Sequence, residues 1–96
     1  MTNSDLEKEF FEYIEIGRNL PKQAPDTMLI AYGFYKQALV GDNNSERPTE
    51  NSDVVRTFMY DQWKRLQGMS REEAMTKYIN FIKELVKKNQ EAAKSK

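Results

Sequence analysis

The sequence predicts an all-α fold in which four helices form one domain. Apolar residues recur at helical spacing in four separate stretches, and no stretch alternates with period two for long enough to be a convincing strand. The length of 96 residues is close to the commonest size of a single domain. We therefore expect one domain over residues 1–96, with residues 1–3 and about 89–96 frayed, since the tail holds nothing more apolar than two alanines.

The first helix is predicted over about residues 4 to 17. Ser4 and Glu7 have the spacing of a capping box, in which each side chain bonds to a backbone N–H at the helix start. Gly17 is a plausible end. Residues 18–25 contain two prolines and no periodicity, so they are predicted to be a connection.

The second helix is predicted to begin at Pro25 and Asp26, because proline is tolerated in a first turn and aspartate is favourable there. It should run to about Val40. Gly33 in its middle costs about 0.5–1 kcal/mol relative to alanine, so a close neighbour is expected at that point. The polar segment 41–51 that follows is long for a connection in a small bundle, which makes it either functional or loosely ordered.

Two further helices complete the prediction. The third takes its N-cap from residues 51–53 and ends at Gly68. The fourth begins at a second capping box, formed by Ser70 and Glu73. Its predicted inner face includes Ala74, Tyr78, Leu85 and either Phe81 or Ile82.

Composition narrows the classes of function. The chain contains neither cysteine nor histidine, so the commonest general base and the commonest metal ligands are missing, and an enzyme is not expected. Fifteen basic residues balance fifteen acidic ones, without the basic excess that is typical of nucleic-acid binding. No apolar run approaches the roughly 20 residues that span a bilayer, and no signal pattern opens the chain. We expect a cytoplasmic monomer without stable membrane insertion and without a cofactor.

One face of the second helix carries the strongest candidate site. Tyr32, Tyr35 and Lys36 stand at i, i+3 and i+4, which places two phenols and an ammonium side by side. They suit a ligand that has both an aromatic ring and phosphate. The alternative is that the tyrosines border the core with their hydroxyls in water and that Lys36 is a solvated charge.

The same stretch resembles a family signature. Residues 32–48, YGFYKQALVGDNNSERP, closely resemble the signature of the acyl-CoA-binding protein family, which is aromatic-x-x-Tyr-Lys-Gln-Ala-x-x-Gly-Asp-x-Asn-x-x-Arg-Pro. A second block, from Tyr60 to Ile79, is similar to the family as well. Spacing between the blocks agrees apart from one apparent extra residue near residues 49–52.

The resemblance implies an up-down-down-up four-helix bundle that carries long-chain acyl-CoA esters and catalyses nothing. Tyr32 would meet the adenine and 3′-phosphate end of CoA, Tyr35 would lie along the ligand and Lys36 would pair with the 3′-phosphate. Tyr78 would close on the head group from the fourth helix. Further candidate contacts to acyl-CoA are Gly33, Phe34, Met59, Arg56 and Arg18.

The chain departs from the family pattern where the third helix begins. Lysines are usual at three positions that are here occupied by Val55, Thr57 and Met59. Loss of a phosphate-binding lysine removes a charge-assisted contact worth about 1.5–3 kcal/mol. Arg56 could replace it, and so could Arg18 or Lys22 at the first connection.

We therefore expect an intracellular carrier of medium- to long-chain acyl-CoA esters. The acyl tail would lie in a groove between helices, and the tyrosines and Lys36 would hold the nucleotide. The alternative is a helical protein-interaction module that has lost or weakened acyl-CoA binding and uses the same groove for a peptide helix.

Overall fold

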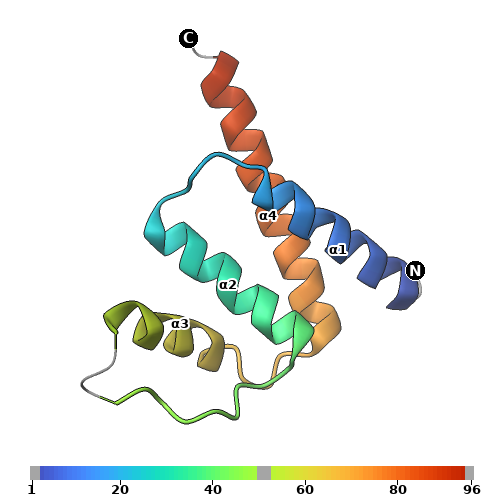
Figure 1. The fold of residues 1–96 in the computed structure, drawn as a ribbon. Helices are drawn as coiled ribbons and strands as arrows, with labels where there is room; N and C mark the ends of the chain where they lie inside the picture. Colours follow the sequence, from blue (N-terminus) through green and yellow to red (C-terminus); the bar gives the residue numbers. More distant parts are fainter. Residues whose placement is uncertain (1–2, 50–52, 95–96) are drawn as a thin grey trace.

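The computed structural model describes residues 3–49 and 53–94, and these residues form four helices and no strand. The helices are α1 (Asn3–Arg18), α2 (Pro25–Leu39), α3 (Val54–Lys64) and α4 (Arg71–Lys94). In Figure 1, α2 and α3 run in one direction, while α1 and α4 run in the other. The predicted up-down-down-up bundle is therefore confirmed.

The helices do not share one central core. Helix α4 packs against both α1 and α2, whereas α3 packs against α2 alone among the described helices. The core lies between α1, α2 and α4 and consists of Phe10, Ile14, Ala38, Ala74, Met75, Tyr78, Ile79, Ile82 and Leu85. Helix α3 contributes no buried residue. The molecule is consequently flat, with extents of 44 × 37 × 17 Å, and the apolar side chains of α3 stay accessible.

The long connection after α2 follows from the parallel course of α2 and α3. A helix of 15 residues is about 22 Å long, and the chain has to travel back over this length before α3 can begin. The first part of this return loop is held by hydrogen bonds from α3. The Trp63 indole Nε1 donates to the Gly41 carbonyl at 2.8 Å, and Lys64 Nζ donates to the carbonyl of the fully buried Asn43 at 3.0 Å. These bonds hold the beginning of the loop against α3, while residues 50 and 51 of the predicted segment lie outside the described residues.

A second set of hydrogen bonds ties the end of α2 to the turn before α4. The buried Gln37 side chain donates through Nε2 to Asp42 Oδ1 at 2.9 Å and to the Met69 carbonyl at 2.8 Å. The Gly68 N–H donates to the same Asp42 oxygen at 2.8 Å, and this bond chiefly keeps the pKa of Asp42 below its usual value. Gly41 and Gly68 adopt positive φ angles of 95° and 93°, which explains why glycine stands at both turns.

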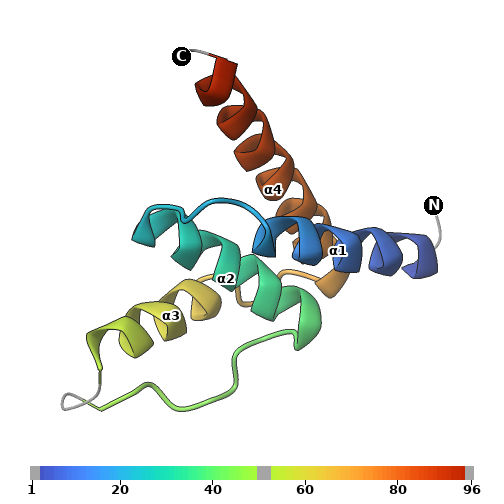
Figure 2. The same ribbon diagram turned by 45° about the horizontal axis from the view of Figure 1, so that its top comes forward.

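Two predicted helix ends differ from the structure. Helix α3 ends at Lys64 rather than Gly68, because i→i+3 bonds such as Leu66 N–H to the Trp63 carbonyl turn the chain early. Helix α4 continues to Lys94, although fraying was expected from about residue 89. Residues 89–94 include Gln, Glu, Ala and Lys, which are strong helix formers, and Figure 2 shows this end of α4 projecting beyond the other helices.

The predicted helix starts agree more closely. Asp53 caps α3 by accepting a hydrogen bond from the Val55 N–H at 2.8 Å, while residues 51 and 52 lie outside the described residues. Ser70 Oγ accepts from the Glu73 N–H at 3.0 Å, as the second capping box requires. Ser4 lies inside α1, which begins one residue earlier. Across residues 3–49 and 53–94, no helix combines the length and hydropathy needed to cross a bilayer.

Candidate ligand-binding site

A row of tyrosines crosses the interface between α2 and α4. The rings of Tyr35 and Tyr78 lie 6.4 Å apart, and Tyr32 stands three residues before Tyr35 on the same face of α2. Burial raises the pKa of Tyr78 above its ordinary value, with a further rise from Tyr35 that Arg18 partly opposes. Burial also raises the pKa of Tyr32, again with a contribution from Tyr35. Both phenols therefore remain protonated near neutral pH and can donate hydrogen bonds to anionic oxygen.

The Lys36 side chain extends from α2 toward Trp63 of α3. Its Nζ lies 4.8 Å from the centroid of the Trp63 ring, and this indole is itself fixed to the return loop. A cation–π contact of this kind contributes about 0.5–1 kcal/mol at a partly exposed site. The ammonium is thus placed on the same helix face as the tyrosines, in a half-buried setting.

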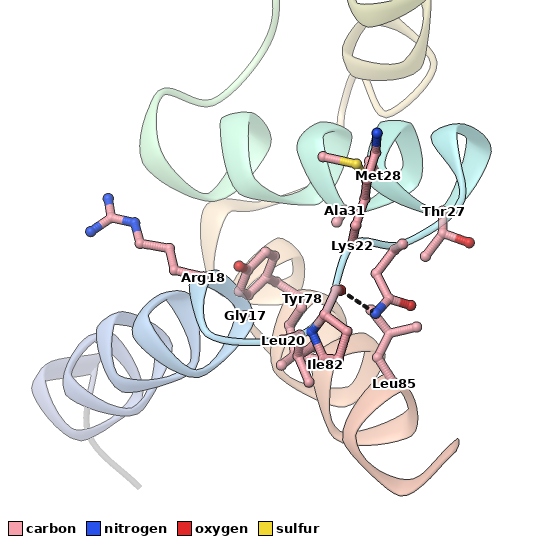
Figure 3. Close-up of a pocket in the computed structure, with 12 residues that line it drawn as sticks. Gly17, Arg18, Leu20, Lys22, Thr27, Met28, Ala31, Tyr78, Ile82 and Leu85 are labelled. Atoms are coloured by element: carbon pink, nitrogen blue, oxygen red, sulfur yellow. Dashed lines mark hydrogen bonds between the residues drawn. The ribbon is translucent and has the colours of Figure 1, made fainter. Parts of the chain in front are cut away.

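The first hollow lies between the end of α1, the connection to α2, and α4 (Figure 3). Its volume is about 280 Å³, and Arg18 and Lys22 give it a basic rim. The Tyr78 side chain lines this hollow beside Gly17. A Cβ added to Gly17 would lie 3.2 Å from the Tyr78 hydroxyl oxygen. Arg18 is not free, because its guanidinium forms a 2.6 Å ion pair with Glu15.

The second hollow is apolar and larger, at about 480 Å³. It separates the first two turns of α2 from the first two turns of α3, and its walls are Pro25, Met28, Leu29, Tyr32, Val54, Val55, Phe58 and Met59. Four of these apolar side chains are more than half exposed, namely Met28, Val54, Val55 and Phe58. A cluster of exposed apolar side chains of this kind marks a binding groove in many proteins.

The third hollow, called the polar hollow below, is more polar than the apolar hollow and has a volume of about 250 Å³. It lies between α3, the return loop and α2, and it is lined by Tyr32, Ser45, Glu46, Pro48, Arg56, Met59, Tyr60 and Trp63. It shares Tyr32 and Met59 with the apolar hollow, and the apolar hollow shares Met28 with the hollow of Figure 3. The three hollows therefore follow one another around the N-terminal half of α2.

The structure separates the predicted site residues into two groups. Tyr32, Tyr78, Arg18, Arg56 and Met59 each line one or two of the three hollows. Tyr35 and Lys36 stand next to this group, through the Tyr78 and Trp63 rings respectively.

Gly33 and Phe34 face neighbouring helices instead. Gly33 allows close approach of α3, since an added Cβ would lie 3.1 Å from the Gln62 carbonyl oxygen. The Phe34 ring meets the Phe81 ring of α4 edge-on, with centroids 6.2 Å apart. Both residues position α2 in the bundle.

Sequence reasoning missed the apolar walls contributed by α3. Val54 and Phe58 have helical spacing, which normally indicates a core face, so they did not stand out as site residues. The sequence feature that could have indicated a binding site was their position directly after a long polar loop and next to the positions where the family pattern has lysines. Within the described part of the chain, α3 packs against no helix other than α2, and this packing shows that the face is open.

The arrangement is suited to binding an amphipathic molecule. Phenol and cationic donors line the two polar hollows, and an apolar hollow joins them. Among the described residues, no group of three histidines, cysteines, aspartates or glutamates gathers in a way that could hold a metal ion. The donors present are those that recognise phosphate and aromatic rings.

Comparison with known proteins identifies the family. The sequence model of the family described as "Acyl CoA binding protein" matches residues 7–82. The acyl-CoA-binding protein of Gossypium hirsutum is 45% identical over 82 residues, covering 83% of this chain and 90% of the relative. Acyl-CoA-binding domain-containing protein 1 of Oryza sativa subsp. japonica is 40% identical over 89 residues, covering 92% and 97%.

Solved structures agree with these sequence relatives. The crystal structure of acyl-CoA-binding protein 2 from Oryza sativa superposes with a TM-score of 0.83 at 37% identity, and the match covers 95% of this chain and 98% of that one. A second crystal structure, from Moniliophthora perniciosa, gives a TM-score of 0.77 at 37% identity, covering 85% and 81%. On this evidence the chain belongs to the acyl-CoA-binding protein family.

Proposed function

We propose that this protein is a non-catalytic carrier of medium- to long-chain acyl-CoA esters. The observation that carries the proposal is the continuity of the three hollows around α2, in which an apolar hollow adjoins two hollows with cationic and phenolic donors. An acyl-CoA has the same division, with an alkyl tail joined to a charged nucleotide. The family and the names of the relatives support this ligand class.

The acyl tail fits the apolar hollow between α2 and α3. Its walls are almost entirely aliphatic or aromatic carbon, and they are exposed to water as long as no ligand covers them. Each methylene that leaves water for such surroundings contributes about 0.8 kcal/mol, or close to a fourfold gain in affinity. Affinity should consequently rise with chain length until the hollow is full.

The nucleotide fits the polar side of α2. Tyr32 and Tyr35 offer ring faces to the adenine, these two residues and Tyr78 offer hydroxyl groups to phosphate oxygens, and Lys36 supplies a positive charge beside them. Their helices are fixed by core packing, so these groups need little rearrangement to receive a ligand.

Calorimetric titration with palmitoyl-CoA, palmitate and CoA tests the proposal. Palmitoyl-CoA should bind most tightly, because it alone fills both the apolar and the polar hollows. An absence of binding to palmitoyl-CoA at micromolar protein would end the carrier proposal. Release of free CoA during the titration would show thioester hydrolysis and would contradict a non-catalytic role.

The alternative of a protein-interaction module is not favoured, because the relatives are named for acyl-CoA binding. The form that we propose is a cytoplasmic monomer. Sedimentation of the purified chain and fractionation of cells would test these two points.

A further inference from the structure

Two methionine side chains stand where the apolar hollow meets each of the other two hollows. Met28 of α2 lines both the apolar hollow and the hollow of Figure 3. Met59 of α3 lines both the apolar hollow and the polar hollow. Each thioether therefore lies at a boundary between carbon-lined and more polar surroundings, and a ligand that follows the three hollows would cover both of them.

Solvent reaches these two side chains more easily than the buried methionine of the core. Met28 is 55% exposed and Met59 is half-buried, whereas Met75 is 4% exposed. Met69 packs against the core and lines none of the three hollows. The chain contains no cysteine, so a peroxide meets no thiol that would react before the thioethers.

We infer that Met28 and Met59 form a reversible oxidation site, at which a peroxide lowers the affinity of this carrier for acyl-CoA. The inference rests on the proposed function and deepens it, since it gives a regulation of the same site. In the reaction a sulfur lone pair attacks one oxygen of hydrogen peroxide and the O–O bond breaks. A sulfoxide forms, and the other oxygen leaves as water. The thioether loses two electrons and the peroxide gains two.

A sulfoxide changes what the apolar hollow can bind. It converts an apolar side chain into a polar one. Apart from the Tyr32 hydroxyl, the side chains around the two methionines in this hollow are aliphatic or aromatic and offer no donor to the new oxygen. An acyl tail laid against this oxygen would remove its water without replacing the lost hydrogen bonds, which costs free energy. Toward the nucleotide, the same oxygen would face phosphate oxygens, which are also acceptors.

The two thioethers belong to opposite walls of the hollow. Met28 is contributed by α2 and Met59 by α3, so oxidation would make both walls more polar. Met59 stands where the family pattern has a lysine, a side chain without sulfur. The pair of oxidisable groups is therefore a departure of this chain from the family pattern.

The first measurement is the rate of oxidation at each methionine. The protein would be treated with hydrogen peroxide in the absence and presence of saturating palmitoyl-CoA, and peptide mass spectrometry would give the sulfoxide fraction at each position. Met28 and Met59 should oxidise before Met75, because solvent reaches them more easily. Palmitoyl-CoA should slow their oxidation severalfold and leave the rate at Met69 unchanged.

The second measurement is the affinity after the peroxide has been removed. Calorimetry should show that oxidation weakens binding of palmitoyl-CoA by about fivefold or more, as expected when a polar group is buried without a partner. Treatment with the two methionine sulfoxide reductases, one for each sulfoxide epimer, and a dithiol should restore the affinity. In that step the sulfoxide oxygen leaves as water while the dithiol becomes a disulfide.

Leucine variants assign the effect to the two positions. The combined variant Met28→Leu and Met59→Leu keeps nearly the same side-chain volume without sulfur. Peroxide should change its affinity by less than about twofold relative to its own untreated affinity. Met69→Leu is the matched control, because it retains both thioethers of the hollow and should lose as much affinity on oxidation as the wild type. Each single variant at position 28 or 59 should lose an intermediate amount, which keeps the comparison available if the combined variant unfolds.

The possible failures are distinguishable. An unchanged affinity of the wild type with sulfoxide at both positions, or an equal loss in the combined leucine variant, would overturn the inference and leave the carrier proposal standing. The same holds for a loss that the reductases do not reverse, and for oxidation that bound palmitoyl-CoA does not slow. Untreated protein that binds no palmitoyl-CoA would overturn the proposed function and this inference with it.

Discussion

At the scale of single residues, the Lys36 ammonium contacts one aromatic ring in the structure and would exchange this contact for a phosphate in the proposed complex. Without ligand it lies over the Trp63 ring, and Trp63 in turn holds the return loop through Gly41. A phosphate oxygen would give the ammonium a charge-assisted hydrogen bond, which is worth more than a partly exposed cation–π contact. The ring thus keeps Lys36 oriented toward the proposed ligand at little energetic cost.

Replacement of Lys36 by alanine should therefore weaken binding of palmitoyl-CoA by more than about 1 kcal/mol, while the helix content stays unchanged. Calorimetry and far-ultraviolet circular dichroism measure these two effects. Lys83→Ala is a matched control, because Lys83 also lies over an aromatic ring, that of Tyr13 at 5.6 Å, but away from the three hollows. Equal affinity in Lys36→Ala and the wild type would show that Lys36 does not hold the ligand.

At the scale of the helices, Gly33 decides how closely α2 and α3 approach. An alanine inside a helix is ordinarily more stable than glycine by about 0.5–1 kcal/mol. Here the added Cβ would lie 3.1 Å from the oxygen and 3.3 Å from the carbon of the Gln62 carbonyl. These are backbone atoms of α3, and they cannot move without shifting the whole helix.

Gly33→Ala should consequently destabilise the protein by about 1 kcal/mol or more, in spite of the better helix propensity of alanine. Gly17→Ala is the comparison, because its Cβ would meet only side-chain atoms, the Tyr78 oxygen at 3.2 Å and the Ile82 Cδ1 at 3.3 Å. Such atoms can move aside, so this variant should lose less stability. Urea unfolding of both variants measures the difference. A stabilised Gly33→Ala would contradict the close approach of the two helices.

Helix α3 contributes one wall of the apolar hollow, and Phe58 is its largest side chain there. Because α3 buries no residue of its own, its apolar face gains most when a ligand covers it. The contribution of this face should therefore depend on the length of the acyl chain.

Phe58→Ala should reduce the affinity for palmitoyl-CoA by about 1–2 kcal/mol and affect octanoyl-CoA much less. Phe11→Ala is a closely matched control, since Phe11 is 53% exposed and Phe58 is 52% exposed, but Phe11 lies on α1 and does not line the apolar hollow. Titrations with acyl chains of 8 to 16 carbons would measure the dependence. A parallel loss at every chain length would place the tail elsewhere.

At the scale of the whole molecule, α2 is the helix on which the proposed site depends. It packs against α4 on one side and α3 on the other, and each hollow includes residues of α2. A ligand that follows the hollows would bridge α3 to the rest of the bundle, to which it is otherwise attached through α2 and the return loop.

Saturation with palmitoyl-CoA should therefore stabilise the folded state. At a ligand concentration of 100 times the dissociation constant, the stabilisation is about 2.7 kcal/mol, which corresponds to a rise in melting temperature of roughly 10 °C or more for a domain of this size. Calorimetric melting with and without ligand measures it, and amide hydrogen exchange should show the greatest added protection in α3. Equal protection across all helices would argue against a bridging ligand.

Much of the fold was predictable because it depends on local signals. Prolines, capping residues and apolar spacing predicted four helices, and Asp53 and Ser70 cap them as expected. The end of α3 at Lys64 was not predictable, since the Trp63 and Lys64 side chains that bond to the return loop act through contacts distant in sequence. Apolar spacing does not predict how far α4 extends, because helix propensity rather than core packing determines the length of a helix end that contains so few apolar residues.

The sequence by itself determined the four helices, the face that carries Tyr32, Tyr35 and Lys36, and the resemblance to a family. These depend on spacing along one helix and on a contiguous motif, and both can be recognised from the order of residues in the sequence. Among the residues that the structure describes, 3–49 and 53–94, tertiary structure alone decided that α3 packs only against α2, that Val54, Val55 and Phe58 stay exposed, and that Arg18 is engaged by Glu15. Burial and charge pairing are properties of neighbours in space, and spacing along the chain does not specify them.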